Sequence, residues 1–335
     1  MPRLSLILKL RILFTICTIL VLFVRCKNTP KQNSESSFLT NLDSPILIEG
    51  DDHKAFRDPL IIFEDEKFWL FYSVATNETD SIIQGKAFWQ TAYSTSQDLK
   101  NWSAPKFITP KDLSLNYASP GSINKVGDEW VLALQTYPTP NGEKFGNKDS
   151  RLWTMRSTDL KNWSSPELMM FMGENVPQED MPRMIDPCII QDKNEDGKWW
   201  CFSKINSSVN MSWSKDLDIW NYEGFVEGGE NACVIVQDDK YILFHSPENG
   251  IGIKQSSDLR DWQDITHLTL GQNNWPWSQG RITAGYVLDA RNIPNVGTYI
   301  MVFHGEKDKD SFTVNCNIGI AWSDDLKTWH WPVEK

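Results

Sequence analysis

Short apolar runs alternate with polar turns over most of the chain, and no long stretch shows the periodicity of a helix. One unit joins the apolar runs 60–63 and 68–72 through the polar turn Glu64-Asp65-Glu66. Similar pairs of runs recur at 122–133, 188–202, 233–244 and 285–303. Two short apolar runs joined by a polar turn are typical of an antiparallel hairpin, so the pattern predicts an all-β fold.

A seven-residue pattern, Ser-x-Asp-Leu-x-x-Trp, occurs five times along the chain. The copies occupy residues 96–102, 157–163, 214–220, 256–262 and 323–329. In such a turn the Ser and Asp side chains bond nearby backbone N–H groups, while Leu and Trp pack the turn onto a sheet. We therefore interpret the five Asp residues as structural. Five hairpins, each followed by one such turn, predict a five-bladed β-propeller with four antiparallel strands per blade.

Acidic residues recur just before the innermost strand of the predicted blades. The corresponding segments are 56–59, 118–121, 185–187, 230–232 and 282–284, and in a propeller they ring one mouth of the central channel. Asp58, Asp186 and Glu230 lie in three of these segments. Cleavage of a glycosidic bond needs one carboxyl group as acid and a second as base or nucleophile. An Asp before Pro is also common in turns, but three acids at one blade position favour catalysis.

The Arg-Asp-Pro motif at 57–59 and the Ile-Asp-Pro motif at 185–187, with Glu230 in the same register, resemble glycoside hydrolase family 43. The five-bladed relatives in families 32, 68 and 117 are similar too. The resemblance implies an inverting mechanism in which Asp58 activates water, Asp186 tunes and orients, and Glu230 protonates the leaving oxygen. The fourth-blade motif departs from the family's Glu-Gly-Pro, so Glu227 is an alternative acid.

Four further residues are candidates for contact with the sugar. Arg57 and Ser119 lie in the predicted ring, and Arg281 precedes the fifth inner strand, in reach of a sugar or of a carboxylate. His304 resembles a central-channel histidine that some family members use beside a metal ion or water, with a core position as the alternative. The resemblance implies that no cofactor is required and leaves a structural calcium ion open. Trp89, Trp153, Trp275 and Trp277 lie outside the heptads; one or two of them are candidates for stacking on a sugar face, with core packing as the default for each.

The formal net charge is −11 and the pI is near 5.0. This balance argues against nucleic-acid binding, which usually requires a basic face. It favours a neutral sugar over an anionic polymer unless a local cationic pocket reverses the field. The four cysteines beyond the N-terminal segment include no Cys-x-x-Cys spacing, so buried free thiols and one disulfide are the alternatives.

The N-terminal segment has the features of an export signal. Basic residues at 3, 9 and 11 precede an apolar stretch at 12–24, which is too short to span a bilayer comfortably. Cys26 follows as in a bacterial lipoprotein signal, although Arg25 stands where a small residue is expected. We predict a signal at 1–26, a tether at 27–42 and a catalytic propeller at 43–335. The protein is then exported and anchored through a lipid, with plain secretion or a signal anchor as the alternative.

Together these features predict a glycosidase that acts on plant or algal oligosaccharides or polysaccharides. The resemblance favours arabinofuranosides and xylosides as substrates. Two alternatives stay within enzymes: a retaining, fructosidase-like reaction and hydrolysis of algal oligosaccharides. The third is a non-catalytic propeller that binds glycans at the cell surface. Because a binding protein has no need of three acids around one mouth, the acids favour the enzyme.

Overall fold

The computed structural model describes residues 37–77 and 87–333. The predicted signal at 1–26 and the first part of the predicted tether lie outside the described residues. The last part of the tether range forms the short 3₁₀ helix η1 (Phe38–Asn41), and Leu39 and Leu42 are buried in a hydrophobic cluster with the strands of the domain. Within the described residues, no helix is long and apolar enough to cross a membrane.

The regular structure is almost entirely β, as predicted, and the described residues contain three antiparallel sheets of four consecutive strands. The first comprises β6 (Tyr117–Val126), β7 (Glu129–Thr136), β8 (Leu152–Ser157) and β9 (Glu167–Leu168). The second comprises β10 (Ile185–Gln191), β11 (Trp199–Ile205), β12 (Ser208–Ser214) and β13 (Trp220–Glu227). The third comprises β14 (Glu230–Gln237), β15 (Lys240–Ser246), β16 (Ile251–Ser256) and β17 (Gln263–Leu268).

The other strands form an eight-stranded sheet that falls into two antiparallel groups. One contains β2 (Lys54–Glu64), β3 (Lys67–Asn77), β4 (Ala87–Ser96) and β5 (Lys106–Phe107). The second contains β18 (Arg281–Asp289), β19 (Tyr299–Glu306), β20 (Cys316–Ser323) and, on β20, β1 (Ile46–Ile48). A parallel pairing of Ala55 with Cys316 joins β2 to β20. The chain therefore completes its last strand group with a strand from its beginning.

Three short 3₁₀ helices lie in the connections between strands. They are η2 (Gln178–Asp180), η3 (Gln272–Asn274) and η4 (Pro276–Ser278). The two latter helices pack the stacked rings of Trp275 and Trp277 against Phe303 of β19. These two tryptophans are therefore core residues.

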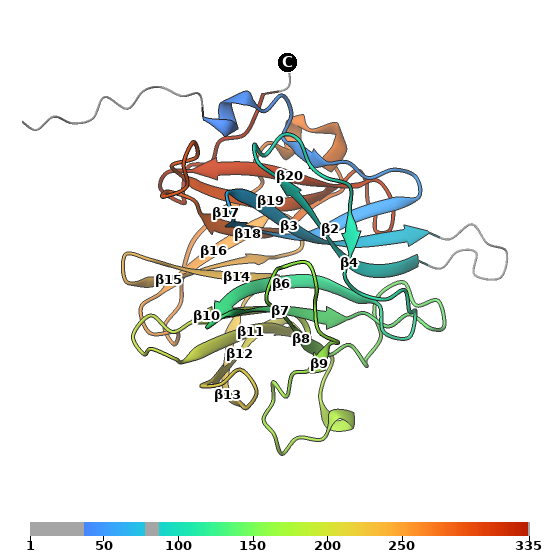
Figure 1. The fold of residues 1–335 in the computed structure, drawn as a ribbon, viewed down its shortest axis with the longest axis vertical. Coiled ribbons are helices and arrows are strands. Elements are labelled where there is room, and N and C mark those ends of the chain that lie inside the picture. Colours follow the sequence, from blue (N-terminus) through green and yellow to red (C-terminus); the bar gives the residue numbers. More distant parts are fainter. Residues whose placement is uncertain (1–36, 78–86, 334–335) are drawn as a thin grey trace, which may run out of the picture. The chain divides into compact units, whose positions relative to one another are not determined.

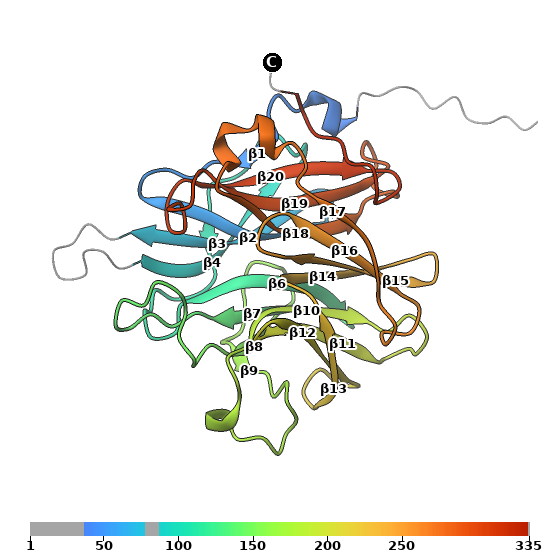
Figure 2. The same cartoon turned by 180° about the vertical axis from the view of Figure 1, so that it is seen from behind.

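The first strands of the five groups, β2, β6, β10, β14 and β18, contact one another in chain order, and β18 contacts β2. Figures 1 and 2 show this order by colour, with the red strands β18–β20 returning beside the blue strands β2 and β3. The strands β6 and β10 approach so closely that a Cβ atom on Gly121 would lie 1.6 Å from the carbonyl oxygen of Pro187. Only glycine fits such an approach. The first strands of all five groups thus surround one region.

The five heptads form equivalent turns after the third strand of each group. In the first, the Asp98 carboxylate accepts the backbone N–H groups of Lys100 at 3.0 Å and Asn101 at 2.8 Å. The indole of Trp102 donates to the carbonyl of Leu99 at 2.9 Å. The other four turns repeat these contacts. In every copy the Leu is buried and has a left-handed φ between 61° and 67°. These contacts agree with the structural interpretation of the repeat.

Apolar side chains fill the space between neighbouring strand groups. One cluster joins Phe71 of β3 and Tyr93 of β4 to Leu132 of β7. The four cysteines of the described chain lie in such clusters, and all four are buried and free, namely Cys188, Cys201, Cys233 and Cys316. Of the two alternatives for these residues, free thiols are confirmed.

Candidate active site

Each of the five first strands carries a bulge with a left-handed residue at the same position. These residues are Asp58, Ser119, Asp186, Asn231 and Ala284, with φ between 44° and 56°. At each of them the register with the second strand shifts. Because a left-handed non-glycine residue costs about 1–2 kcal/mol, five in equivalent places indicate a shared structural device.

The bulges refine the alignment of the acids. Asn231, rather than Glu230, is the equivalent of Asp58 and Asp186, and Glu230 lies one residue earlier. Glu230 therefore projects from a position that Arg57 holds in the first group. The acids meet in one place although they do not share one position in the repeat.

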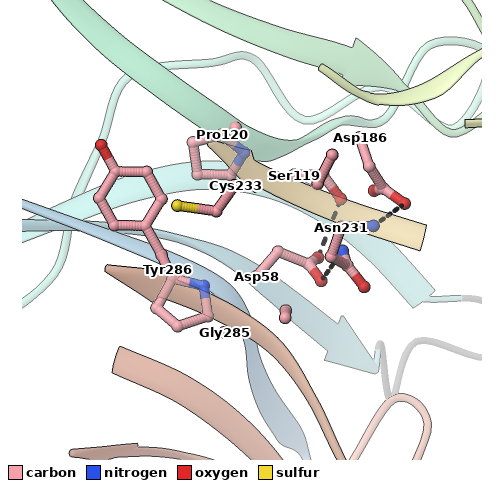
Figure 3. Close-up of a pocket in the computed structure, with 12 residues that line it drawn as sticks. Asp58, Ser119, Pro120, Asp186, Asn231, Cys233, Gly285 and Tyr286 are labelled. Atoms are coloured by element: carbon pink, nitrogen blue, oxygen red, sulfur yellow. Dashed lines mark hydrogen bonds between the residues drawn. The ribbon is translucent and has the colours of Figure 1, made fainter. Parts of the chain in front are cut away.

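A cavity of about 390 Å³ lies at these bulges. It is lined by most of the predicted site residues, namely Arg57, Asp58, Ser119, Asp186, Glu230 and Arg281. A smaller void of about 30 Å³ shares several lining residues with it and is lined by all five first strands (Figure 3). The structure thus brings together every predicted site residue except His304.

Asp58 is held by several side chains around it. The hydroxyl groups of Ser73 and Ser119 both donate to its Oδ2 at 3.0 Å, and Nδ2 of Asn231 lies 3.5 Å from its Oδ1. Figure 3 shows the carboxylate facing Ser119 and Asn231. Burial raises the pKa of Asp58, while the charge of Arg57 and the two hydroxyl groups oppose the shift. Asp58 is therefore an oriented carboxyl group with an increased proton affinity.

Asp186 has the most strongly raised pKa among the acids of the cavity for which a shift is resolved. Burial, and then the negative charges of Glu230 and Asp58, raise the pKa of Asp186 to about 8. The backbone N–H of Asn231 donates to its Oδ2 at 3.1 Å and opposes the shift. Asp186 is therefore mostly protonated at neutral pH, and the cavity does not hold three full negative charges at once.

Glu230 forms an ion pair with Arg281, whose guanidinium also donates to the hydroxyl of Thr283 at 3.3 Å. The sequence predicts that Arg281 contacts a sugar or a carboxylate, and in the structure it contacts the carboxylate of Glu230. Glu227, the alternative acid, is exposed at the end of β13 and does not line the cavity. The placement therefore favours Glu230 over Glu227.

Arg57 and His304 lie behind the carboxylates. Arg57 is buried, pairs with Glu306 at 2.8 Å and lies 4.6 Å over the ring of Phe312. His304 is 1% exposed, does not line the cavity, and accepts the backbone N–H of Asp58 on Nδ1 at 3.0 Å. The expectation that His304 contacts the sugar does not fit this position, because Asp58 separates it from the cavity. His304 positions Asp58 instead.

The protonation state of His304 follows from its surroundings. Burial, and then the positive charges of Arg57 and Arg281, lowers the pKa of His304 well below its ordinary value. The ring is therefore neutral. Because Nδ1 accepts a hydrogen bond, the proton of the neutral ring lies on Nε2.

Sequence reasoning missed a row of hydrogen-bond acceptors on the second strands. In four groups, the residue opposite the bulge accepts the N–H of the left-handed residue in the next group. The pairs are Ser73 with Ser119, Gln135 with Asp186, Ser246 with Ala284, and His304 with Asp58. The signal was present in the sequence, because each acceptor follows the second apolar run of its hairpin by one or two residues.

The third group breaks this pattern. Its residue opposite the bulge is Lys204, which pairs in register with Ile185 and cannot accept a hydrogen bond. The N–H of Asn231 in the next group donates to Asp186 instead. Lys204 lines the cavity.

Aromatic side chains form one side of the cavity. The ring of Trp89 lies 5.5 Å from that of Tyr137 and 5.3 Å from that of Phe312, between centroids. Phe145 packs edge-on against Phe312 and is 54% exposed. Of the tryptophans outside the heptads, Trp89 is the one that lines this cavity. These rings offer an apolar surface to a sugar face.

Among the described residues, no group of three or more His, Cys, Asp or Glu side chains is placed to hold a metal ion. Several buried nitrogens have no described hydrogen-bond partner, and Nε2 of His304 is the imidazole nitrogen among them. Calcium takes six to eight oxygen ligands, so a lone imidazole does not make a calcium site.

No family model and no curated protein sequence matches the chain. Solved structures match it over most of its length. An α-L-arabinofuranosidase from Podospora anserina, in complex with cellotriose, is 16% identical with a TM-score of 0.59, over 85% of this chain and 98% of the other. A family 43 β-xylosidase/α-arabinofuranosidase from a compost microbial metagenome, in complex with xylotriose, is 11% identical with a TM-score of 0.59, over 87% and 97%. The chain therefore shares the fold of these two glycosidases.

A family 117 glycoside hydrolase from Zobellia galactanivorans shares this fold as well. It is 15% identical with a TM-score of 0.57, over 81% of this chain and 86% of the other. The resemblance to families 43 and 117 that the sequence motifs indicated is therefore confirmed at the level of the glycoside hydrolase fold.

Proposed function

We propose that the protein is a glycoside hydrolase and that its five strand groups are the blades of a propeller around the cavity. The meeting of Asp58 and Glu230, from different groups, in one cavity carries the proposal. Glycosidic bond cleavage uses such a pair of carboxyl groups. The fold supports it, since the similar solved structures are glycosidases and two of them hold cellotriose or xylotriose.

In the proposed reaction Asp58 is the general base that activates water. The hydroxyl groups of Ser73 and Ser119 both donate to Oδ2 at 3.0 Å, whereas the contact of Oδ1 with Nδ2 of Asn231 is long, at 3.5 Å, so Oδ1 is the oxygen that takes the proton from water. A raised pKa makes the ionised Asp58 a stronger base than an exposed Asp. The neutral ring of His304 fixes the backbone of Asp58 and adds no charge that would weaken the base.

Glu230 is the proposed general acid. A carboxylate engaged by a guanidinium is a poor proton donor, so the reaction requires that bound substrate draws Arg281 away from Glu230. Arg281 is then available to a sugar hydroxyl. The protonated Asp186 adds no negative charge beside Glu230, and through Asn231 it holds the bulge next to the acid.

The reaction that we expect first is inverting and arabinofuranosidase- or xylosidase-like. The family 43 motifs and the printed activities of two similar structures support this expectation. Hydrolysis of algal oligosaccharides is the alternative that the family 117 structure favours, and a retaining, fructosidase-like reaction is the other. We also propose, from the N-terminal sequence, that the protein is exported and lipid-anchored.

The test is a hydrolysis panel of aryl glycosides and of plant and algal oligosaccharides. Wild type and the double variant Asp58→Asn/Glu230→Gln are measured side by side. We expect wild type to release sugar and the folded double variant to fall to the background rate. Unchanged turnover in the double variant would place the chemistry elsewhere. No turnover by wild type, together with binding of a glycan, would support the non-catalytic propeller.

A further inference from the structure

Four cationic side chains line the cavity, and two of them are already neutralised. Arg57 and Arg281 each form an ion pair with a glutamate. The other two are Arg183 and Lys204. Neither of these is part of an ion pair among the described residues. The cavity therefore holds two positive charges that its own acids do not pair.

The two cations belong to one wall. Lys204 on β11 is the register partner of Ile185 on β10, and Arg183 precedes Ile185 by two residues. All three residues line the cavity. The Nε atom of Arg183 donates to the carbonyl of Gly146 at 3.1 Å, which leaves the end of the guanidinium without a described hydrogen-bond partner.

The position of Lys204 is informative because the other four groups show what usually stands there. In each of them the equivalent residue is an acceptor that holds the next bulge. In the third group Lys204 replaces this acceptor, and the backbone N–H of Asn231 donates to Asp186 instead. A half-buried lysine that replaces a structural acceptor and faces a cavity is explained by a ligand rather than by the fold.

The charge balance of the cavity favours an anionic ligand. Glu230 is neutralised by Arg281, and Asp186 is mostly protonated at neutral pH. Asp58 is then the one remaining negative charge in the described lining, against the two unpaired cations Arg183 and Lys204, so the cations of the lining exceed its anions. Burying two unpaired cations under a neutral sugar costs free energy, whereas an acidic group on the sugar pairs with them.

We propose that the cavity recognises an acidic sugar, whose carboxylate or sulfate group is bound by Arg183 and Lys204. The hydrolysis of an acidic sugar rests on the proposed hydrolase function, whereas the binding of an acidic sugar does not. It reverses the preference for a neutral sugar that the net charge of the whole chain indicates, because the local field of the cavity differs from that of the molecule.

Matched oligosaccharides test the proposal. Acidic oligosaccharides from pectin, alginate and carrageenan are each compared with a carboxyl-reduced or desulfated counterpart. Binding is measured by calorimetry with the Asp58→Asn variant, and hydrolysis with wild type. We expect at least one acidic member to be preferred by about tenfold or more, and the preference to weaken with added salt.

Variants of the two cations locate the effect. Lys204→Gln and Arg183→Gln should each lower the preference about tenfold, Lys204→Arg should restore it, and the exposed Lys240→Gln should leave it unchanged. Equal treatment of acidic and neutral members, or a preference that survives Lys204→Gln, would overturn the proposal. Hydrolysis without a preference for acidic oligosaccharides would contradict the acidic-sugar proposal but not the proposed hydrolase function. Lys204-dependent binding without any hydrolysis supports it and sinks the proposed hydrolase.

Discussion

Two fivefold sets of left-handed residues recur in the strand groups, one in the heptad turns and one in the bulges of the first strands. In the turns the residue is a buried Leu in every copy, and the same hydrogen bonds to Asp recur. In the bulges the five residues include two Asp, one Ser, one Asn and one Ala. The backbone repeats in both sets, but the side chains repeat only in the turns. A repeated backbone thus supports a site whose side chains differ from group to group.

The Asp residues of the heptad turns and those of the bulges contribute to stability with opposite signs. Backbone N–H groups of Ile219 and Asp218 lower the pKa of Asp216. Asp216 therefore contributes stability that is present above its unfolded pKa, near 4, and lost as the pH falls through its folded pKa. Burial raises the pKa of Asp186 to about 8, so stability is lost as the pH rises from about 4 through 8. At neutral pH Asp216 stabilises the fold, whereas Asp186 weakens it.

The largest expected effect on this comparison comes from Glu230→Gln. Loss of a general acid lowers kcat/KM by about 10²–10⁴-fold for a poor leaving group, and much less for an activated aryl leaving group that needs no proton. Rates for a series of aryl glycosides of rising leaving-group pKa check this. The exposed Glu227→Gln is the matched control, and a loss of activity there equal to that in Glu230→Gln would contradict the assignment.

A turn residue should do the opposite and change stability alone. Leu259 is 4% exposed in the fourth heptad, so Leu259→Ala removes buried methyl groups and costs about 2–5 kcal/mol. Urea unfolding measures the loss. The kcat/KM below the unfolding transition should stay at the wild-type value, and a drop in activity without a drop in stability would break the division between turns and bulges.

Two Asp→Asn variants test the opposite signs directly. Asp216→Asn weakens a carboxylate–backbone contact and should lower Tm at pH 5 and at pH 8.5, by about 2–4 °C for about 1 kcal/mol. Asp186→Asn removes a buried carboxyl group whose ionisation destabilises the fold. The Tm of this variant should therefore rise relative to that of wild type as the pH increases, and the difference should be largest at pH 8.5. Calorimetry at both pH values decides; shifts of the same sign in both variants at pH 8.5 would refute the contrast.

The smallest effect is expected at Ala284, the bulge residue that carries no polar group. Ala284→Gly relieves a left-handed alanine but adds freedom to the unfolded chain, so the net change in stability should stay within about 1 kcal/mol. The kcat/KM should be unchanged. A tenfold loss of activity would show that the fifth bulge shapes the site through its backbone.

The sequence was sufficient to predict the order of strands in the sheets, and most of the side chains that it predicted for the site line the cavity. Apolar runs and heptads recur with the same order of elements, and each of the three acids stands two or three residues before such a run. The short strands β5 and β9 have two residues each, too few to show an alternating pattern. They are predicted only because a propeller blade has four strands and the apolar pattern accounts for three.

The parts that the sequence did not predict depend on cross-strand register. Ser73 and Gln135 hold the bulges of neighbouring groups, and His304 lies under Asp58, because of pairings between distant strands. The one-residue offset of Glu230 from the bulge has the same cause. Arg183 and Lys204 stand in no motif of the sequence, and their significance comes from their place in the cavity wall without a paired acid among the described residues.

The most direct test compares two Asp→Asn substitutions in the first strand group, one in the bulge and one in the heptad turn. The kcat/KM and Tm of Asp58→Asn and Asp98→Asn are measured with one substrate from the panel. We predict that Asp58→Asn loses about 10³-fold in kcat/KM without a loss of stability, whereas Asp98→Asn keeps kcat/KM within about twofold and lowers Tm. Retained activity in Asp58→Asn, or equal losses of activity in both variants, would contradict the account.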